Sequence, residues 1–253
     1  MSNEDFARRF GLEGGEFYVT APAACPYLTG KRERKVFSYL SGAGASSTNG
    51  LLTRRGFRRS QNIIYLPACE GCSACVPVRV VTSDFKMSKS RKRILTRNAD
   101  LIRRVKEPRA TGEQFSVLRG YLDDRHDDGG MADMTVLDYA SMVEETAVDT
   151  MVVEYRLRDN NTGDERLIAT ALTDKLTDGL SMVYSFFEPD EAARSLGRFM
   201  ILDHISLARE FDLPYVYLGY WVQGSPKMDY KTDFQPLERL AATGWVRMDR
   251  QAP

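Results

Sequence analysis

The stretch LSMVYSFFEPDEAARSLGRFMILDHISLAREFDLPYVYL (residues 180–218) decides the fold. It begins with a strand-like run, Leu180–Phe187, and continues as an amphipathic segment, Arg194–Glu210, whose apolar residues recur at helical spacing. A second β-rich run, Tyr215–Leu218, follows and ends at Gly219. The stretch therefore predicts a strand, a helix and a strand in succession.

Two further strand-like runs precede this unit, Thr150–Arg158 and Arg166–Lys175. Turn signals separate the runs, at residues 160–163 (NNTG) and 178–179 (DG). Short runs joined by such turns are typical of antiparallel hairpins. We therefore expect a three-stranded antiparallel meander before the helix.

Two helices are expected before the meander. Apolar residues have helical spacing over Glu113–Arg125 and Val136–Glu145, and the DDRHDDGGM segment between them is typical of a loop. Two helices, a meander, a helix and a strand follow the order of a GNAT-type acyltransferase. The predicted fold class is therefore α+β.

The turn into the third helix distinguishes among acyl donors. GNAT enzymes carry a Q/R-x-x-G-x-G/A pattern there, whose backbone amides hold the pyrophosphate of coenzyme A. The corresponding residues, 194–199, read RSLGRF. We expect the ring of Phe199 to obstruct a pyrophosphate, so the donor should not be coenzyme A.

Formal charge is unevenly distributed along the chain, although its net value is zero. Residues 1–110 hold 21 Lys and Arg against 9 Asp and Glu, and the remainder holds 14 against 26. Such segregation indicates that the first part faces a polyanion. We therefore expect two domains, residues 1–110 and residues 111–253.

Composition also restricts the location of the protein. No apolar run approaches the roughly 20 residues that a membrane span needs, and the N-terminus, MSNEDFARRF, lacks the apolar segment of a signal peptide. We therefore expect a cytoplasmic protein with no membrane association, whose thiols are reduced unless they hold metal.

The basic part contains short elements. Residues 1–16 are typical of a loose arm and residues 41–50 of a flexible loop, whereas residues 31–40 suit a helix or a strand equally. The expected strands are Phe17–Thr20, Ile63–Pro67 and Val76–Val81.

Basic residues cluster repeatedly in this part. Between Lys86 and Arg109 there are ten basic residues and two acidic ones. A run of this density is usually a solvated face, but together with the other basic clusters it favours a continuous surface for nucleic acid. The candidate phosphate contacts are Arg91, Lys92, Arg93, Arg103 and Arg104.

All four cysteines also lie in the basic part. Cys69, Cys72 and Cys75 are spaced as in iron–sulfur ligand runs, and Cys25 would complete a set of four. Reduced thiols in such a pattern hold metal more often than they form disulfides. The alternative is four small buried apolar side chains.

The candidate substrate site is the stretch YVYLGYWVQGSPKMDYKTDFQPLERL (215–240), in which rings and cations surround a turn at a strand end. Rings stack on a base or line an apolar pocket, and lysines bind phosphate or carboxylate. A core strand followed by a solvated loop is the alternative. The candidate residues are Tyr220, Trp221, Lys227, Tyr230 and Lys231.

Nearly the whole chain resembles the bacterial aspartate/glutamate leucyltransferases, relatives of the arginyl-tRNA–protein transferases. The motifs that carry the resemblance are CPYL (25–28), GFRRSQNIIYLPACEGCSACVPVRV (56–80), RNADL (97–101), YSFFEPDEAARSLG (184–197) and LGYWVQGSPKMDYKTDFQPLERL (218–240).

The resemblance implies transfer of leucine from Leu-tRNA to the α-amine of proteins that begin with Asp or Glu, which marks them for degradation. It also implies an N-terminal family domain joined to a GNAT-like domain. The related arginyltransferases are linked to an iron–sulfur cluster through cysteines, although their spacing differs from the one here. Arginine as the donor is the alternative.

This reaction asks little of the side chains. An aminoacyl ester is activated, and an α-amine with a pKa of about 7.7–8.0 is partly free at neutral pH, so we expect positioning without a cofactor. Neither His126 nor His204 belongs to a triad pattern, and we assign no catalytic residue. A guanidinium suits the acceptor carboxylate, which makes Arg58 and Arg59 candidates for acceptor recognition or for the tRNA terminus.

Two other function classes fit the sequence less well. A non-catalytic, metal-stabilised RNA-binding module would explain the basic part and the cysteines, but not the second domain. A coenzyme A-dependent acetyltransferase is opposed by Phe199.

Overall fold

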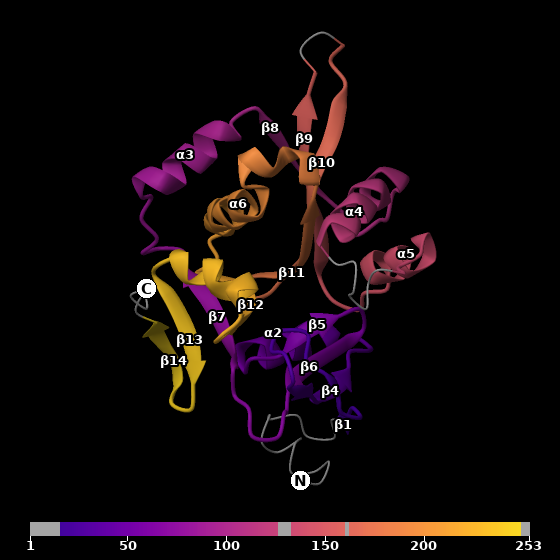
Figure 1. The fold of residues 1–253 in the computed structure, drawn as a ribbon, viewed down its shortest axis with the longest axis vertical. Helices are drawn as coiled ribbons and strands as arrows, with labels where there is room; N and C mark the ends of the chain where they lie inside the picture. Colours follow the sequence, from indigo (N-terminus) through magenta and orange to yellow (C-terminus); the bar gives the residue numbers. More distant parts are fainter. Residues whose placement is uncertain (1–15, 126–132, 160–161, 249–253) are drawn as a thin grey trace.

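An eight-stranded sheet forms the centre of the protein, for which the computed structural model describes residues 16–125, 133–159 and 162–248 (Figure 1). The strand order is β14-β13-β7-β12-β11-β10-β9-β8, and the pairs are antiparallel except β11 with β12. Its strands are β7 (Cys75–Val81), β8 (Leu101–Lys106), β9 (Thr150–Arg158), β10 (Glu165–Lys175), β11 (Gly179–Phe187), β12 (Tyr215–Val222), β13 (Leu237–Ala241) and β14 (Gly244–Met248).

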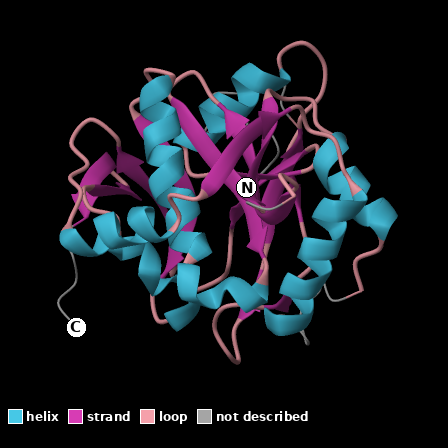
Figure 2. Cartoon of the chain, turned by 90° about the horizontal axis from the view of Figure 1, so that it is seen from above, coloured by secondary structure: helices cyan, strands magenta, loops and turns pink. Residues whose placement is uncertain are grey.

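Helices lie along both faces of this sheet (Figure 2). One face packs against α4 and α5 and the other against α6, because neighbouring strand residues such as Val152 and Val153 point to opposite cores. A further helix, α3, packs beside α6, and two short 3-10 helices flank α6 and β12. The bounds are α3 (Lys89–Arg97), α4 (Gly112–Arg125), α5 (Val136–Glu144), α6 (Leu196–Glu210), η1 (Pro189–Arg194) and η2 (Pro226–Asp233).

A second, four-stranded sheet carries the N-terminal part, in the order β1-β4-β6-β5. Helix α2 (Ala45–Arg54) packs with it around a separate core that includes Val36, Leu52, Phe57 and Ile64. A two-stranded sheet lies beside it. The strands are β1 (Tyr18–Val19), β2 (Ala23–Ala24), β3 (Arg32–Glu33), β4 (Lys35–Tyr39), β5 (Arg58–Ser60) and β6 (Ile63–Pro67).

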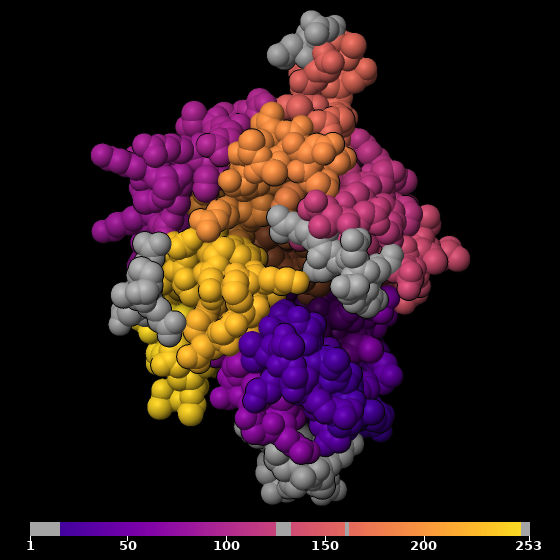
Figure 3. All heavy atoms as spheres, viewed as in Figure 1, coloured from indigo at the N-terminus to yellow at the C-terminus, as the bar shows by residue number. Residues whose placement is uncertain are grey.

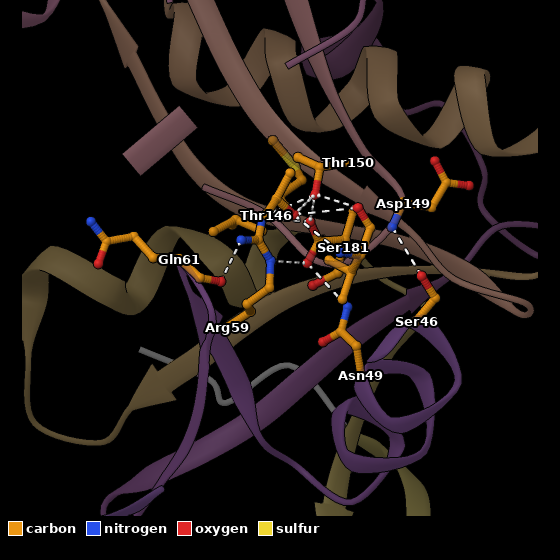
Figure 4. A network of polar contacts seen from close by, with 12 residues as sticks. Ser46, Asn49, Arg59, Gln61, Thr146, Asp149, Thr150 and Ser181 are labelled. Carbon is orange, nitrogen blue, oxygen red and sulfur yellow. Dashed lines mark hydrogen bonds and ion pairs between the residues drawn. The ribbon is translucent and has the colours of Figure 1, made fainter. Parts of the chain in front are cut away.

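A buried ion pair joins the two sheets. Arg59 of β5 donates from Nε and Nη2 to the two carboxylate oxygens of Asp174 on β10, both at 2.7 Å, and each side chain is 1% exposed. Thr150 and Asn49 donate to the same carboxylate (Figure 4). This network fixes β5, and the residues beside Arg59, against the large sheet.

The expected order of the second half is confirmed. The meander is β9, β10 and β11, and two helices precede it while α6 and β12 follow it. Two expectations were wrong. Residues 41–50 were expected to form a flexible loop, but α2 begins at Ala45, because burial of Ala45 and Leu52 outweighs the low helix propensity of Gly and Ser. Strand β12 continues past Gly219 to Val222, because Gly219 takes a positive φ of 76° and shifts the register without ending the strand.

Residues 31–40, which suited a helix or a strand equally, contain the strands β3 and β4. The expected domain boundary near residue 110 falls between β8 and α4, yet β7 and β8 pair within the large sheet. The two-domain division therefore stays a prediction. Residues 1–15 and the predicted loop around His126 lie outside the described residues, and no helix of the described part is long and apolar enough to cross a membrane.

Candidate functional site

The candidate site is the place where β11 and β12 separate. The two strands pair only where Gly179–Ser181 of β11 faces Tyr215–Tyr217 of β12. Beyond that point β11 pairs with β10 alone and β12 with β7 alone. The sheet is therefore open between its two central strands.

Both strands carry an extra residue at the level where they separate. On β11, Met182 and Tyr184 face consecutive residues of β10, so Val183 is unpaired. On β12, Tyr217 and Gly219 face consecutive residues of β7, so Leu218 is unpaired. Bulges of this kind turn backbone groups out of the ladder.

Arg58 of β5 inserts into this opening. Its Nη1 donates to Ser181 Oγ at 3.2 Å, and its Nη2 donates to the carbonyls of Met182 and Val183, the latter at 3.2 Å. The guanidinium passes over Gly219, where a Cβ atom would lie 2.8 Å from Arg58 Nε. A cation thus lies at the opening, and within the described residues it has no carboxylate partner.

Lys231 of η2 holds the other bulge. Its Nζ donates to the carbonyls of Leu218 and Tyr220, at 2.9 and 2.7 Å. The side chain is buried, and desolvation followed by the nearby Arg58 charge lowers its pKa to about 7. Lys231 therefore shapes β12 and does not face solvent.

The other candidate residues of the stretch 215–240 differ in burial: Tyr220 and Trp221 are buried, whereas Lys227 and Tyr230 are not. Tyr220 is buried beside the opening, and its hydroxyl donates to the Gly56 carbonyl at 2.9 Å. Trp221 lies in the main core and is 5% exposed. Lys227 is exposed and Tyr230 half-buried on η2. The structure thus brings Arg58, Tyr220 and Lys231 together, whereas Trp221 points into the core.

Arg59 lies apart from this group, because it is bound to Asp174 between the sheets. Residues 58 and 59 follow one another on β5 and therefore point to opposite faces. The two arginines have different roles because of this alternation. The sequence alone did not show which arginine faces the opening and which faces the large sheet.

The four cysteines line one pocket of about 60 Å³, together with Lys35, Tyr65 and Tyr220. Burial, together with the other three thiols, raises the pKa of Cys75 to about 11. The four thiols are free of disulfides. Within the described residues, no group of three or more His, Cys, Asp or Glu side chains is arranged to hold a metal ion.

The predicted phosphate contacts lie on α3 and β8. Lys92 and Arg93 are exposed on α3, whereas Arg91 donates to the Lys86 carbonyl at 2.6 Å. On β8, Arg103 pairs with Asp203 at 3.2 Å and Arg104 with Glu165 at 2.8 Å. Intramolecular partners thus engage three of the five candidates.

The turn before α6 is covered by the segment after α3. Arg194 binds both carboxylate oxygens of Asp100, at 2.8 and 2.9 Å, and Asn98 donates to the Arg194 carbonyl at 2.9 Å. The ring of Phe199 lies in the core, 5.3 Å from that of Tyr155. Our expectation that this ring obstructs the turn was therefore wrong; residues 97–100 lie over the turn instead.

His204 lies in the core. Its Nδ1 donates to the Met200 carbonyl at 2.7 Å, and its Nε2 lies 2.9 Å from Thr173 Oγ1. Desolvation lowers the pKa of the imidazole. These contacts are those of a structural histidine.

Comparison with known proteins gives the family. The description "Arginine-tRNA-protein transferase, N terminus" matches residues 23–93, and "Arginine-tRNA-protein transferase, C terminus" matches residues 113–241. The chain belongs to this family. The chain is therefore an enzyme, an aminoacyltransferase. The names of two similar members of the family agree with this.

Both of these members are named aspartate/glutamate leucyltransferase. The one from Nitrobacter hamburgensis is 59% identical over 239 residues, which cover 92% of each chain. The one from Bradyrhizobium diazoefficiens is 58% identical over 240 residues, covering 93% of each chain. The resemblance expected from the motifs is confirmed.

Solved structures give weaker similarities. FemX has a TM-score of 0.45 at 8% identity, covering 88% of this chain and 83% of its own. The C-terminal domain of a putative lysylphosphatidylglycerol synthetase from Agrobacterium fabrum has a TM-score of 0.44 at 15% identity, covering 79% and 57%. These scores are too low to assign a function to the transferase.

Sequence patterns missed the contact made by Ser181 and the structural role of Lys231. Ser181 gave no signal of its contact with Arg58, because nothing in a strand pattern reports the side chain of another element. Lys231 was expected to bind substrate, yet both carbonyls that it binds belong to its own chain. A glycine inside an apolar strand was the available signal for the bulge at Gly219.

Proposed function

We propose that the enzyme transfers leucine from Leu-tRNA to the N-terminal amine of proteins that begin with Asp or Glu. The names of the similar family members support the donor and the acceptors. The product carries an N-terminal leucine and is thereby marked for degradation in the cytoplasm. Arginine remains the alternative donor, because the family description names it.

Arg58 is the structural feature that best supports an acidic acceptor. A guanidinium carries five N–H donors, and the contacts of Arg58 with Ser181, Met182 and Val183 use three of them. The remaining donors lie at the opening between β11 and β12. A charge-assisted hydrogen bond to a carboxylate is worth about 1.5–3 kcal/mol, so a carboxylate placed there gains over a neutral amide.

The reaction requires the ester and the amine to meet in one geometry. The amine attacks the ester carbonyl, the bond to the ribose oxygen breaks, and the released tRNA hydroxyl takes up the proton that the amine loses. Positioning alone supplies roughly 7–11 kcal/mol of such a barrier. Arg58 fixes the acceptor side chain, and Lys231 keeps β12 open by holding the carbonyls on either side of Gly219.

We propose that the tRNA body approaches α3. Lys92 and Arg93 are exposed there, and Arg104 on β8 is half-exposed. Phosphate contacts of this kind set affinity without reading sequence. The rings of Tyr220 and Tyr230 are the proposed contacts of the aminoacyl end, with Lys227 as the nearest exposed cation on η2.

Coenzyme A is not the proposed donor. Its pyrophosphate would need the backbone amides at the N-terminus of α6. In this chain Arg194 and the segment that contains Asn98 and Asp100 cover that turn. An aminoacyl ester, in contrast, needs no pyrophosphate site.

A zinc ion or an iron–sulfur cluster at Cys25, Cys69, Cys72 and Cys75 is a separate proposal. It is supported by the convergence of the four thiols on one pocket. A metal there would tie the loop after β6 to the N-terminal hairpin and take no part in transfer. Metal, iron and sulfide analysis after anaerobic purification tests it, and a metal-free, fully active protein would end the proposal.

A transfer assay tests the proposed function. Purified enzyme is given each charged tRNA in turn and peptides that begin with Asp, Glu, Asn or Gln. Leucine should be transferred to the Asp and Glu peptides only. Transfer of arginine would replace the donor, and an absence of transfer from every charged tRNA would remove the proposed function.

A further inference from the structure

Three aromatic side chains, two exposed and one half-buried, form a cluster on the outer face of the N-terminal sheet. Tyr18 is 41% exposed and Tyr39 is 58% exposed, and their ring centroids lie 5.8 Å apart. Phe37 contacts both, at 5.5 and 5.9 Å. Exposed rings in mutual contact form an apolar patch, which in a soluble protein typically marks a binding surface. We call Tyr18, Phe37 and Tyr39 the aromatic face.

The aromatic face is continuous with Arg58. The strand registers pair Tyr18 with Phe37, Phe37 with Tyr65, and Tyr65 with Arg58. Directly paired residues of antiparallel strands point to the same side of a sheet. These four side chains therefore form one row across the sheet, which leads from the exposed rings to the opening between β11 and β12.

The length of this row suits a short extended peptide. Three steps between neighbouring strands, at about 4.8 Å each, span roughly 14 Å. An extended chain covers that distance in about four residues, at about 3.3 Å each. The Tyr65 ring continues toward the opening, because it lies 6.5 Å from the ring of Tyr220.

The charges around the aromatic face do not suit a polyanion. The Tyr18 hydroxyl donates to the Glu16 carboxylate at 2.5 Å. Lys35, next to the row, is paired with Glu33 at 2.9 Å. Carboxylates at these positions repel phosphates, whereas the exposed cations Lys92 and Arg93 belong to α3, which lies in the upper part of the molecule, away from β1 near the bottom (Figures 1 and 3).

We propose that the aromatic face binds the acceptor polypeptide, and that residues three to about five of the acceptor lie extended along this row. The inference rests on the proposed function, in which Arg58 binds the carboxylate of the acceptor's first residue. The rings hold the following residues by apolar contact and therefore read little sequence. The enzyme thus recognises a free, extended N-terminus and not the first residue alone.

The experiment compares acceptors of different length on the full-length enzyme. The acceptors are an Asp-led dipeptide and an Asp-led peptide of ten residues, both with saturating Leu-tRNA. Tyr18→Thr and Tyr39→Thr remove the exposed rings and keep a β-branched residue in each strand. Phe211→Thr is the matched control, since Phe211 is 38% exposed and lies at the end of α6.

The wild-type enzyme should have a lower KM for the long peptide than for the dipeptide. Each ring substitution should raise the KM for the long peptide about threefold to tenfold. The kcat, the dipeptide kcat/KM and the melting temperature should stay unchanged, and Phe211→Thr should behave as wild type.

Several results would overturn the inference. A ring variant that loses equal activity on both peptides, or on neither, shows that the face does not contact the acceptor. A raised KM for Leu-tRNA assigns the face to RNA, and a change in sedimentation with peptide affinity unaltered assigns it to a second copy of this chain. Failure of the wild-type enzyme on both Asp-led peptides refutes the proposed function and is thus distinguishable from failure of the inference.

Discussion

Breaking the ion pair between Arg59 and Asp174 should destabilise the protein strongly. The two side chains are 1% exposed and make two contacts of 2.7 Å. In Arg59→Met the carboxylate keeps Thr150 and Asn49 as donors but loses its only ion-pair partner within the described residues. Removing one partner of a buried pair costs about 3–5 kcal/mol, a large part of the roughly 5–15 kcal/mol that stabilises a domain.

Urea unfolding, followed by circular dichroism at pH 7.5, measures this loss. Arg58→Met is the matched control, because the two arginines are adjacent and point to opposite faces of β5. The control loses the hydrogen bonds of Arg58 to Ser181, Met182 and Val183 but breaks no ion pair, so we expect a smaller loss of stability than in Arg59→Met. Arg59→Met/Asp174→Leu should be more stable than the sum of the two single losses predicts, by at least about 2 kcal/mol.

Additive losses, or a loss below about 1 kcal/mol in Arg59→Met, would refute the reasoning. Either result would mean that water reaches the pair or that the sheets meet elsewhere. The role given to Arg58 would then weaken as well, since the network around Arg59 fixes β5 (Figure 4).

Other predictions concern the two bulges and α3. Lys231 has a pKa of about 7 in the folded protein and about 10.4 when unfolded, so the unfolded chain binds more protons between these values. Stability should therefore rise by up to about 1.4 kcal/mol per pH unit above pH 7, a slope that Lys231→Met should lack; parallel urea midpoints from pH 7 to 9 would contradict this. Gly219→Ala should lower transfer to Asp peptides, because its Cβ would displace Arg58, whereas Gly42→Ala, with a similar φ of 70° and nothing within 4 Å, should lose stability only. Equal transfer activity of the two glycine variants would argue against the contact between Gly219 and Arg58. Finally, Lys92→Ala/Arg93→Ala should flatten the salt dependence of tRNA affinity by about 0.7–0.9 per lost contact, and an unchanged slope would exclude α3 from the tRNA surface.

The sequence predicts the second half of the fold well, for physical reasons. The meander strands are buried on both faces, so they read as continuous apolar runs between turn signals, whereas α6 repeats its apolar residues at helical spacing. Helix α2 was missed because its Gly, Ser and Thr residues have low helix propensity, whereas its stability comes from the burial of Ala45 and Leu52.

The site is harder to predict because its contacts are long-range. Arg58 meets Ser181 across 123 positions of the chain, and no local pattern reports such a contact. Trp221 and Lys231 were chosen for their chemistry, yet burial makes one a core residue and the other a support for β12. The four cysteines line one pocket, but no group of three or more His, Cys, Asp or Glu side chains of the described residues is arranged to hold a metal ion, so the metal site stays a prediction.

The specificity of Arg58→Met tests the central claim most directly. The measurement is kcat/KM for matched peptides that begin with Asp and with Asn, together with the KM for Leu-tRNA. We predict that the Asp peptide loses at least about tenfold, since a charge-assisted hydrogen bond of about 1.5–3 kcal/mol disappears. The Asn peptide and Leu-tRNA should change less than about twofold. Equal losses for both peptides, or a loss confined to Leu-tRNA, would contradict the assignment of Arg58 to the acceptor carboxylate.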